Sequence, residues 1–195
     1  MINEKIVLVT DSNTKRTEAS ISDRNLEGNN SIATQKISNA IKNCCKEFQM
    51  YTKIEDFVDN IKQHKNDLIF PMKYGKNTPD SKSIIPGICE GMNMRYIGAD
   101  DYTHMICNDK YTSKLFAKQF GIKSAPCFLV RNFDNKEYVI EAIKNLKLPL
   151  VIKPNFGGGS TGISNNNICF DYDEAIKLCE MFEFLINNGL NHYQL

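Results

Sequence analysis

The residues best suited to chemistry lie in one glycine-rich stretch, Lys153 to Ser164, which follows a short apolar run. Glycines let the backbone approach a ligand closely and leave several N–H groups free to point at one anion. Lys153 would add an ammonium group, which binds phosphate oxygens. Together these residue types favour a β-hairpin that folds over the phosphates of a nucleotide, with a flexible surface hairpin as the alternative. The loop residues in this prediction are Gly157, Gly158, Gly159, Ser160, Thr161 and Gly162.

Two other charged side chains stand at positions where a ligand could meet them. Lys110 follows Asn108-Asp109 in the first turn of a predicted helix, where a lysine opposes the helix dipole and is slightly disfavoured structurally. Glu18 lies on the loop after the first predicted strand. Ligands of open α/β sheets bind at the carboxyl ends of strands, so the Glu18 carboxylate could hold an ammonium group there. For each residue taken alone, a solvated surface charge is the default.

Composition excludes several classes of protein. The chain has 195 residues and a net charge of +1, without the basic surplus of an electrostatic nucleic-acid binder. No apolar run approaches the roughly 20 residues of a membrane helix, and the N-terminus lacks the pattern of a signal peptide. The seven cysteines are odd in number and form no C-x-x-C pair, so they favour reduced thiols in the cytoplasm over disulfides or zinc.

Strands that alternate with helices predict an α/β fold whose first domain, residues 1–99, has a parallel sheet covered by helices. The predicted strands are Lys5–Thr10, Asp67–Met72 and Arg95–Gly98. One apolar stripe at helical spacing runs from Ile32 to Phe48 and predicts a single helix there. A second helix is expected over Ser81–Met92.

Residues 100–195 predict a second domain, which begins with one helix over Tyr102–Phe120 that Gly121 closes. Leu115, Phe116 and Phe120 are expected on the inner face of that helix. The elements expected after it are a strand at Pro126–Arg131, a helix at Glu137–Leu146, strands at Pro149–Lys153 and Ile168–Phe170, a helix capped by Asp171 and Glu174, and a frayed tail over Asn187–Leu195.

Five segments in this order resemble the D-alanine–D-alanine ligase branch of the ATP-grasp superfamily. A set of five motifs in family order over about 160 residues is far more specific than any one of them. The segments are Glu18–Ser22, Phe70–Gly75, Ile84–Gly98, Asn108–Ile122, and Leu148–Lys153 with the glycine loop. The resemblance implies a pre-ATP-grasp domain over 1–99 and the first α+β subdomain of an ATP-grasp fold over 100–195.

The resemblance also implies roles for the candidate residues. Lys110, Lys153 and the loop over 157–162 would contact ATP, and Glu18 would hold the amino group of an amino-acid or small peptide substrate. The reaction would be ATP-dependent: a carboxylate attacks the γ-phosphate, an acyl phosphate forms, and an amine displaces phosphate. The family also uses Mg²⁺, and none of its Mg²⁺ ligands is recognisable in this sequence.

Three departures from the family pattern keep alternatives open. Gly159 stands where the family has a serine, and Tyr74 stands where it has a histidine. The third departure is that no segment after Asp171 resembles the family's last domain. The sequence therefore predicts an N-terminal fragment of a ligase, inactive by itself and exposing an apolar face that could self-associate, for instance as a homodimer. The alternatives are another amino-acid or peptide ligase of the superfamily, a non-catalytic nucleotide-binding or regulatory remnant, and a generic doubly wound domain with one continuous sheet.

Overall fold

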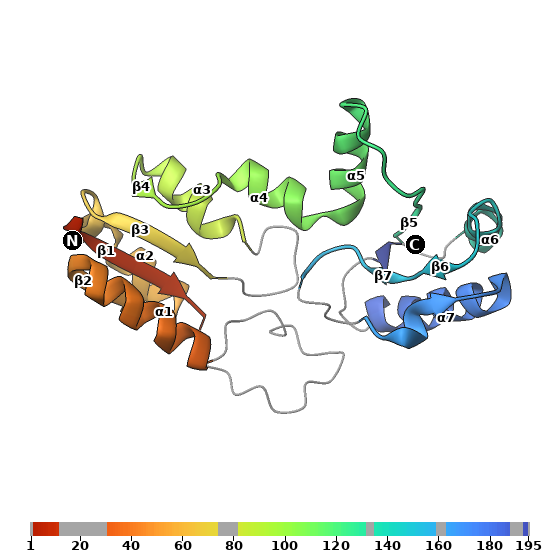
Figure 1. Cartoon of the computed structure of the whole chain (residues 1–195), viewed down its shortest axis with the longest axis horizontal. Coiled ribbons are helices and arrows are strands. Elements are labelled where there is room, and N and C mark those ends of the chain that lie inside the picture. Colours follow the sequence, from red (N-terminus) through yellow and green to blue (C-terminus); the bar gives the residue numbers. More distant parts are fainter. Residues whose placement is uncertain are drawn as a thin grey trace. The chain divides into compact units, whose positions relative to one another are not determined.

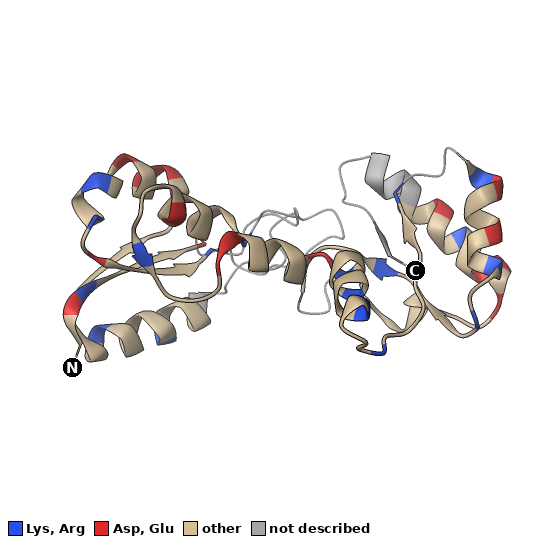
Figure 2. Ribbon diagram, turned by 90° about the horizontal axis from the view of Figure 1, so that it is seen from above, with Lys and Arg blue, Asp and Glu red and all other residues tan. Residues whose placement is uncertain are grey.

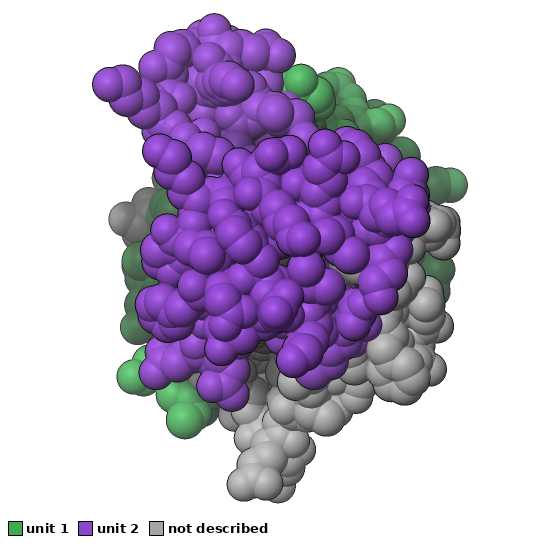
Figure 3. Space-filling view, turned by 90° about the vertical axis from the view of Figure 1, so that its right-hand side faces the viewer, with its two compact units in different colours: residues 1–19, 25–105 green, residues 20–24, 106–195 purple. Residues whose placement is uncertain are grey.

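The structure is a computed structural model, and it describes residues 2–11, 31–73, 82–131, 135–158, 163–187 and 193–194. The described residues form two compact units, which meet in sequence between Met105 and Ile106. Figure 3 colours the two units separately. The predicted division into domains over residues 1–99 and 100–195 stays a prediction, and so do the roles assigned to these domains.

The first unit is built on a parallel sheet with the strand order β2-β1-β3-β4 (Figure 1). The connection from β2 to β3, which the structure describes in full, runs through helical segments, as is usual between parallel strands. Its elements are β1 (Ile2–Thr10), α1 (Ser31–Cys44), β2 (Cys45–Tyr51), α2 (Ile54–Asp59), a 3₁₀ turn (Ile61–His64), β3 (Leu68–Met72), α3 (Ile84–Gly91) and β4 (Arg95–Tyr96). Helix α4 (Asp101–Asn108) follows, and the boundary between the units falls within it. The predicted α/β class, with a parallel sheet and helices, is confirmed.

The run of apolar residues in β1 follows from burial on both faces of the sheet. Val7 and Val9 pack in a cluster with Phe57 of α2 and Ile85 of α3. Ile6 and Leu8 belong to a second cluster, which Ile41 of α1 covers. Because successive side chains of a strand point to opposite faces, a central parallel strand needs apolar residues at every position.

The helix predicted from Ile32 to Phe48 is confirmed as far as Cys44 and is wrong after it. Helix α1 ends at Cys44, and Cys45 begins the edge strand β2, which pairs with β1. Cys45 and Phe48 still belong to the α1 side of the core, so the sequence spacing was consistent with both structures. The spacing of apolar residues alone does not show where a helix ends when a strand follows it without a turn.

The second unit contains two small antiparallel sheets, with the strand orders β5-β9-β7 and β6-β8 (Figure 1). Its elements are α5 (Lys110–Gln119), β5 (Leu129–Val130), α6 (Lys136–Lys144), β6 (Leu150–Val151), β7 (Lys153–Pro154), a 3₁₀ turn (Asn165–Asn167), β8 (Ile168–Cys169), α7 (Tyr172–Asn187) and β9 (Tyr193–Gln194). Separate sheets exclude the generic doubly wound fold with one continuous sheet.

The core of the second unit lies between its strands and the helices α6 and α7. Ile143 and Ile152 are fully buried at its centre. The predicted cap of α7 is confirmed, since the Glu174 N–H donates to Asp171 Oδ1 over 2.8 Å. The predicted frayed tail is wrong in part, because α7 extends to Asn187 and β9 pairs with both β5 and β7.

Two predictions about residues 102–120 are also wrong. The stretch holds two helices, α4 and α5, with a break at Asp109, whose backbone has an extended conformation. Leu115, Phe116 and Phe120 do not form an inner face, because all three are exposed. Within the described part of the chain, α5 has no buried residue.

Candidate functional site

Helix α5 begins at a break that the Asp109 side chain stabilises. Asp109 Oδ1 accepts a hydrogen bond from the Thr112 N–H over 2.8 Å. The first N–H groups of a helix have no partner within it, so an acidic side chain at this position can accept a hydrogen bond from one of them. Its negative charge also interacts favourably with the positive end of the helix dipole. The cap fixes where α5 starts, and therefore where Lys110 lies.

Asn155 joins the start of α5 to the turn that follows β7. Its side chain is completely buried. Its Oδ1 accepts from the Tyr111 N–H over 2.9 Å, and its Nδ2 donates to Asp109 Oδ1 over 2.9 Å. Its backbone carbonyl accepts from the Lys110 N–H over 3.1 Å. These bonds tie three consecutive residues, Asp109 to Tyr111, to the first residues of the glycine-rich segment.

The Lys110 ammonium lies against the backbone at the start of the glycine loop. Lys110 Nζ donates to the carbonyl oxygen of Gly157 over 2.7 Å and to that of Asn155 over 3.2 Å. Gly157 has φ +93°, a left-handed conformation that side chains disfavour. The structure therefore brings together two segments that the sequence separates by 47 residues.

Lys153 occupies β7, just before Asn155, and is half-buried. In the part of the chain that the structure describes, its ammonium group has no hydrogen bond or ion pair. Its strand pairs with β9, where Lys153 lies opposite Gln194. The two lysines thus differ, because carbonyl oxygens hold the Lys110 side chain whereas the Lys153 ammonium has no partner among the described residues.

A closed hairpin base supports the glycine segment. Val151 of β6 pairs with Ile168 of β8, and the buried side chain of Asn167 donates from Nδ2 to the Ile152 carbonyl over 2.9 Å. Ser164 caps the 3₁₀ turn that precedes β8. The predicted hairpin with a returning strand at Ile168 is therefore present, and its described ends are held together by hydrogen bonds.

The structure places some predicted site residues and not others. Lys110 and Gly157 are adjacent, and Lys153 and Gly158 lie in the same segment. The remaining predicted residues lie outside the described part of the chain: Glu18, Gly159, Ser160, Thr161 and Gly162. Sequence analysis missed the role of Asn155, although a polar residue between an apolar strand and a glycine run was a usable signal.

The described residues contain no group of three or more His, Cys, Asp and Glu side chains that could hold a metal ion. No helix among them has both the length and the apolar character that crossing a bilayer requires. All seven cysteines are free thiols.

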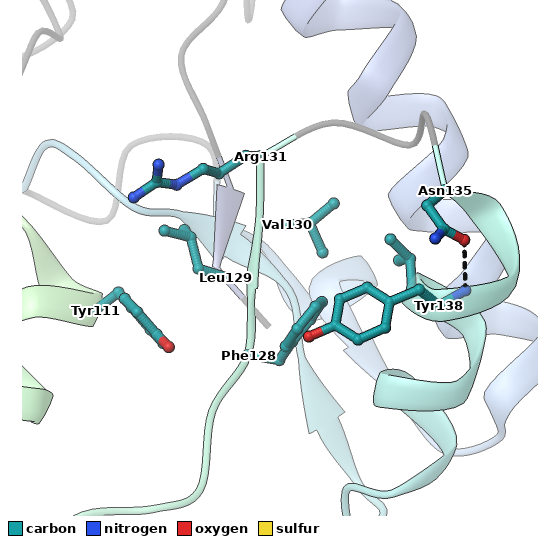
Figure 4. Close-up of a pocket in the computed structure, with 8 residues that line it drawn as sticks. Tyr111, Phe128, Leu129, Val130, Arg131, Asn135 and Tyr138 are labelled. Atoms are coloured by element: carbon teal, nitrogen blue, oxygen red, sulfur yellow. Dashed lines mark hydrogen bonds between the residues drawn. The ribbon is translucent and has the colours of Figure 1, made fainter.

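A cavity of about 340 Å³ lies beside β5 and adjoins the first turn of α5 (Figure 4). The Tyr111 ring lines one side of it, and Phe128 and Tyr138 line another with their rings 5.7 Å apart, edge to face. Arg131 is the charged residue in its wall. Aromatic walls with one guanidinium suit a planar group, and no described residue of the glycine loop takes part in this cavity.

The chain matches no family model. It is 32% identical over 124 residues to the vancomycin C-type resistance protein VanC1 of Enterococcus gallinarum, covering 63% of this chain and 35% of that protein. It is 29% identical over 133 residues to the D-alanine–D-alanine ligase of Coprothermobacter proteolyticus, covering 68% of this chain and 42% of the ligase. The chain is a homologue of the D-alanine–D-alanine ligase family. It spans less than half the length of these two curated relatives.

Solved structures of D-alanine–D-alanine ligases and their relatives have the same fold over nearly the whole chain. The VanG D-Ala:D-Ser ligase of Enterococcus faecalis matches with a TM-score of 0.65 at 20% identity, covering 98% of this chain and 62% of that one. The D-alanine–D-alanine ligase of Bacillus anthracis complexed with ATP matches with a TM-score of 0.61 at 20% identity, covering 98% and 57%. The sequence matches confirm the predicted resemblance to this family, and the structural matches confirm the fold.

Proposed function

We propose that this chain carries the nucleotide-binding part of an ATP-dependent carboxylate–amine ligase of the D-alanine–D-alanine ligase type. One observation carries the proposal: the Lys110 ammonium lies 2.7 Å from the Gly157 carbonyl, so a cation and the first described residues of a glycine loop share one place. A nucleotide triphosphate needs both, because positive charge and backbone N–H groups together neutralise its phosphates.

The two lysines would have different tasks. Lys153 has no hydrogen bond or ion pair within the described ranges and would meet phosphate oxygens first. Lys110 would exchange two carbonyl oxygens for phosphate oxygens, a change of partner that leaves no buried charge unsatisfied at any stage. The N–H groups of residues 157–162 and the hydroxyls of Ser160 and Thr161 would complete the contact with the phosphates as the loop closes.

The reaction would proceed in two steps. A substrate carboxylate attacks the γ-phosphorus of ATP, which forms an acyl phosphate and releases ADP. An amine then attacks the acyl carbon, loses a proton and displaces inorganic phosphate. A closed loop would keep water away from the acyl phosphate, which water would otherwise hydrolyse. Mg²⁺ would balance the phosphate charges, with ligands from outside the described residues.

The substrate would be an amino acid or small peptide, whose amino group Glu18 would hold. The VanG enzyme is a D-Ala:D-Ser ligase and other relatives are D-alanine–D-alanine ligases, so the second amino acid varies among similar proteins. We therefore keep another amino-acid or peptide ligase as the variant of this proposal. Seven free thiols fit a reducing compartment, and we place the reaction in the cytoplasm.

The test is nucleotide-dependent thermal stabilisation of the whole 195-residue chain. A ligand at 100 times its Kd stabilises a protein by about 2.7 kcal/mol, which raises the melting temperature by several degrees. We expect this rise with ADP and ATP for the parent chain and for Lys147→Ala, an exposed lysine near the segment but outside it. Lys153→Ala should weaken binding about tenfold or more, since a charge-assisted bond contributes about 1.5–3 kcal/mol.

Three outcomes bear on the alternatives. No nucleotide-dependent rise in either the parent chain or Lys147→Ala would refute nucleotide binding by this chain. A rise that Lys153→Ala abolishes would support nucleotide binding at this segment, and without phosphate release it fits both the ligase fragment and the non-catalytic nucleotide-binding module. Phosphate release that depends on an added amino acid would favour the ligase.

A further inference from the structure

The C-terminal half of α5 and the residues after it carry an exposed apolar surface. Leu115, Phe116, Phe120 and Ile122 are 42–69% exposed, and no residue of α5 is buried among the described residues. Phe116 and Phe120 contact each other with ring centroids 5.2 Å apart. An isolated helix of ten residues is marginal in water, and apolar packing against a partner is the usual source of its stability. This surface is therefore suited to bind another apolar group.

The same surface is hollowed and strongly basic. A groove of about 600 Å³ runs between α5 and the extended segment after it, with Leu115, Ile122 and Pro126 in its wall. Lys114, Lys118 and Lys123 line it as well. Residues 110–131 include five Lys and Arg and no Asp or Glu, in a chain whose net charge is +1. Figure 2 shows Lys and Arg in blue on α5. The groove therefore favours an apolar group flanked by carboxylates.

The second unit carries such a group elsewhere on its surface. Phe170, between β8 and α7, is 72% exposed, the largest value among the exposed large apolar residues that the structure describes. Asp171 and Asp173 follow it, both exposed. The turn is held firmly, because the Glu174 carboxylate accepts from the Phe170 N–H over 3.1 Å while Asp171 caps the Glu174 N–H. A fixed turn presents the Phe170 ring at little cost in conformational entropy.

We propose that Phe170 of one copy of this chain docks in the α5 groove of a second copy. The ring would contact Leu115, Ile122 and Pro126, and the carboxylates beside it would face Lys118 and Lys123. The two surfaces differ, so the contact is heterologous: each copy keeps one groove and one Phe170 turn available for a further copy. Association of this kind continues past the dimer and weakens when salt screens the charges.

The experiment is sedimentation velocity of the whole chain over a range of concentrations. We expect the weight-average mass to rise past that of a dimer between about 10 and 500 µM, the range of a weak contact. Raising the salt from about 0.05 to 0.5 M shortens the Debye length from roughly 14 to 4 Å and should weaken association severalfold. A monomer at every concentration, or an assembly that stops at two copies, would overturn the proposal.

Charge exchange assigns the contact to these residues. The double variant Lys118→Glu with Lys123→Glu makes the groove acidic. The triple variant Asp171→Asn, Asp173→Lys and Glu174→Gln makes the turn basic, and its amide oxygens can still accept the two hydrogen bonds of the turn. Each variant alone should stay monomeric, and a mixture of the two should associate again, since each groove then meets a turn of opposite charge. The control variant Lys62→Glu with Lys65→Glu changes the net charge by the same amount as the groove variant, at exposed positions of the first unit. It should leave association unchanged.

Two further measurements keep the result unambiguous. Circular dichroism of each variant checks that loss of association is not loss of folding, and Phe170→Ser should abolish association without changing the charge. Binding to vesicles of anionic lipid is measured in parallel. If the parent chain binds vesicles through Lys118 and Lys123 but does not self-associate, the groove belongs to a lipid surface and the proposal is wrong.

Discussion

Helices α6 and α7 of the second unit bury their apolar residues, whereas α5 of the same unit buries none. All three have apolar residues at helical spacing, so this spacing alone does not distinguish them, although α5 has the least apolar sequence of the three. Helix α6 packs Val139 and Ile143 into the core, and α7 packs Ala175 and Cys179 against them. Amphipathic spacing shows that a helix has an apolar face, but only the three-dimensional packing determines whether anything covers that face.

Helix α5 is held instead by hydrogen bonds at its first turn. The side chains of Asp109 and Asn155 and the backbone carbonyl of Asn155 receive or donate bonds at residues 109–112. Polar contacts of this kind fix a helix end in one position, which apolar packing does less strictly because it is not directional. The difference suits a helix whose first residue, Lys110, carries a charge that we propose for phosphate binding.

The largest effect is expected from a variant that creates a cavity in the core that α6 and α7 share. Ile143→Ala removes a fully buried side chain of α6, and we expect the free energy of unfolding to fall by about 2–5 kcal/mol. Urea denaturation followed by circular dichroism measures it. Ile168→Ala, at an exposed isoleucine of β8, is the matched control and should change stability much less. Equal losses in the two variants would contradict the assigned core.

Much of the fold could be predicted because it depends on short-range patterns. The apolar run of β1 and the cap of α7 both have local signals in the sequence, and both are confirmed. The exposed positions of Leu115 and Phe116 could not be predicted, because burial depends on which distant element packs against a helix. The same holds for β9, whose partners β5 and β7 lie more than 30 residues earlier.

The candidate site was predictable in part for the same reason. Lys110, Lys153 and the glycine loop are recognisable by residue type and motif. The hydrogen bonds of Asn155 to Asp109 and Tyr111 join residues 44 and 46 positions apart, and no local pattern announces such pairs. Sequence analysis therefore found the groups that could contact a ligand and missed the residue that positions them.

A second test concerns the hydrogen bonds that hold α5. Asn155→Ala removes a buried partner from both the Tyr111 N–H and the Asp109 carboxylate, and we expect stability to fall by about 2 kcal/mol. The sharper measurement is amide hydrogen exchange, in which the Tyr111 amide should lose protection while that of Ile152 keeps it. Asn166→Ala, an exposed asparagine in the nearby 3₁₀ turn, serves as control. Unchanged exchange at Tyr111 would show that Asn155 is not what fixes the helix start.

The stability of the core that α6 and α7 share should also fall at alkaline pH. Burial, and then the nearby Cys169 and Glu180, raise the pKa of the Cys179 thiol to about 12 from an ordinary value of 9.0. A raised folded-state pKa means that this stabilising contribution is complete below pH 9 and is lost as the pH rises toward 12. Between pH 8 and 10 the loss attributable to this thiol is about 1.4 kcal/mol. Cys179→Ala should remove that part of the pH dependence, and an identical pH profile in the variant would refute it.

The smallest expected effect lies on α5 itself and tests the comparison most directly. Leu115 is 46% exposed, so Leu115→Ala removes few contacts from the folded monomer. Alanine is also the better helix former, which offsets part of the lost burial. We expect the free energy of unfolding to change by less than about 0.5 kcal/mol at low protein concentration, measured by urea denaturation beside Ile143→Ala. A loss of several kcal/mol would mean that α5 packs against part of the chain in solution, and the contrast between α5 and the other two helices would then disappear.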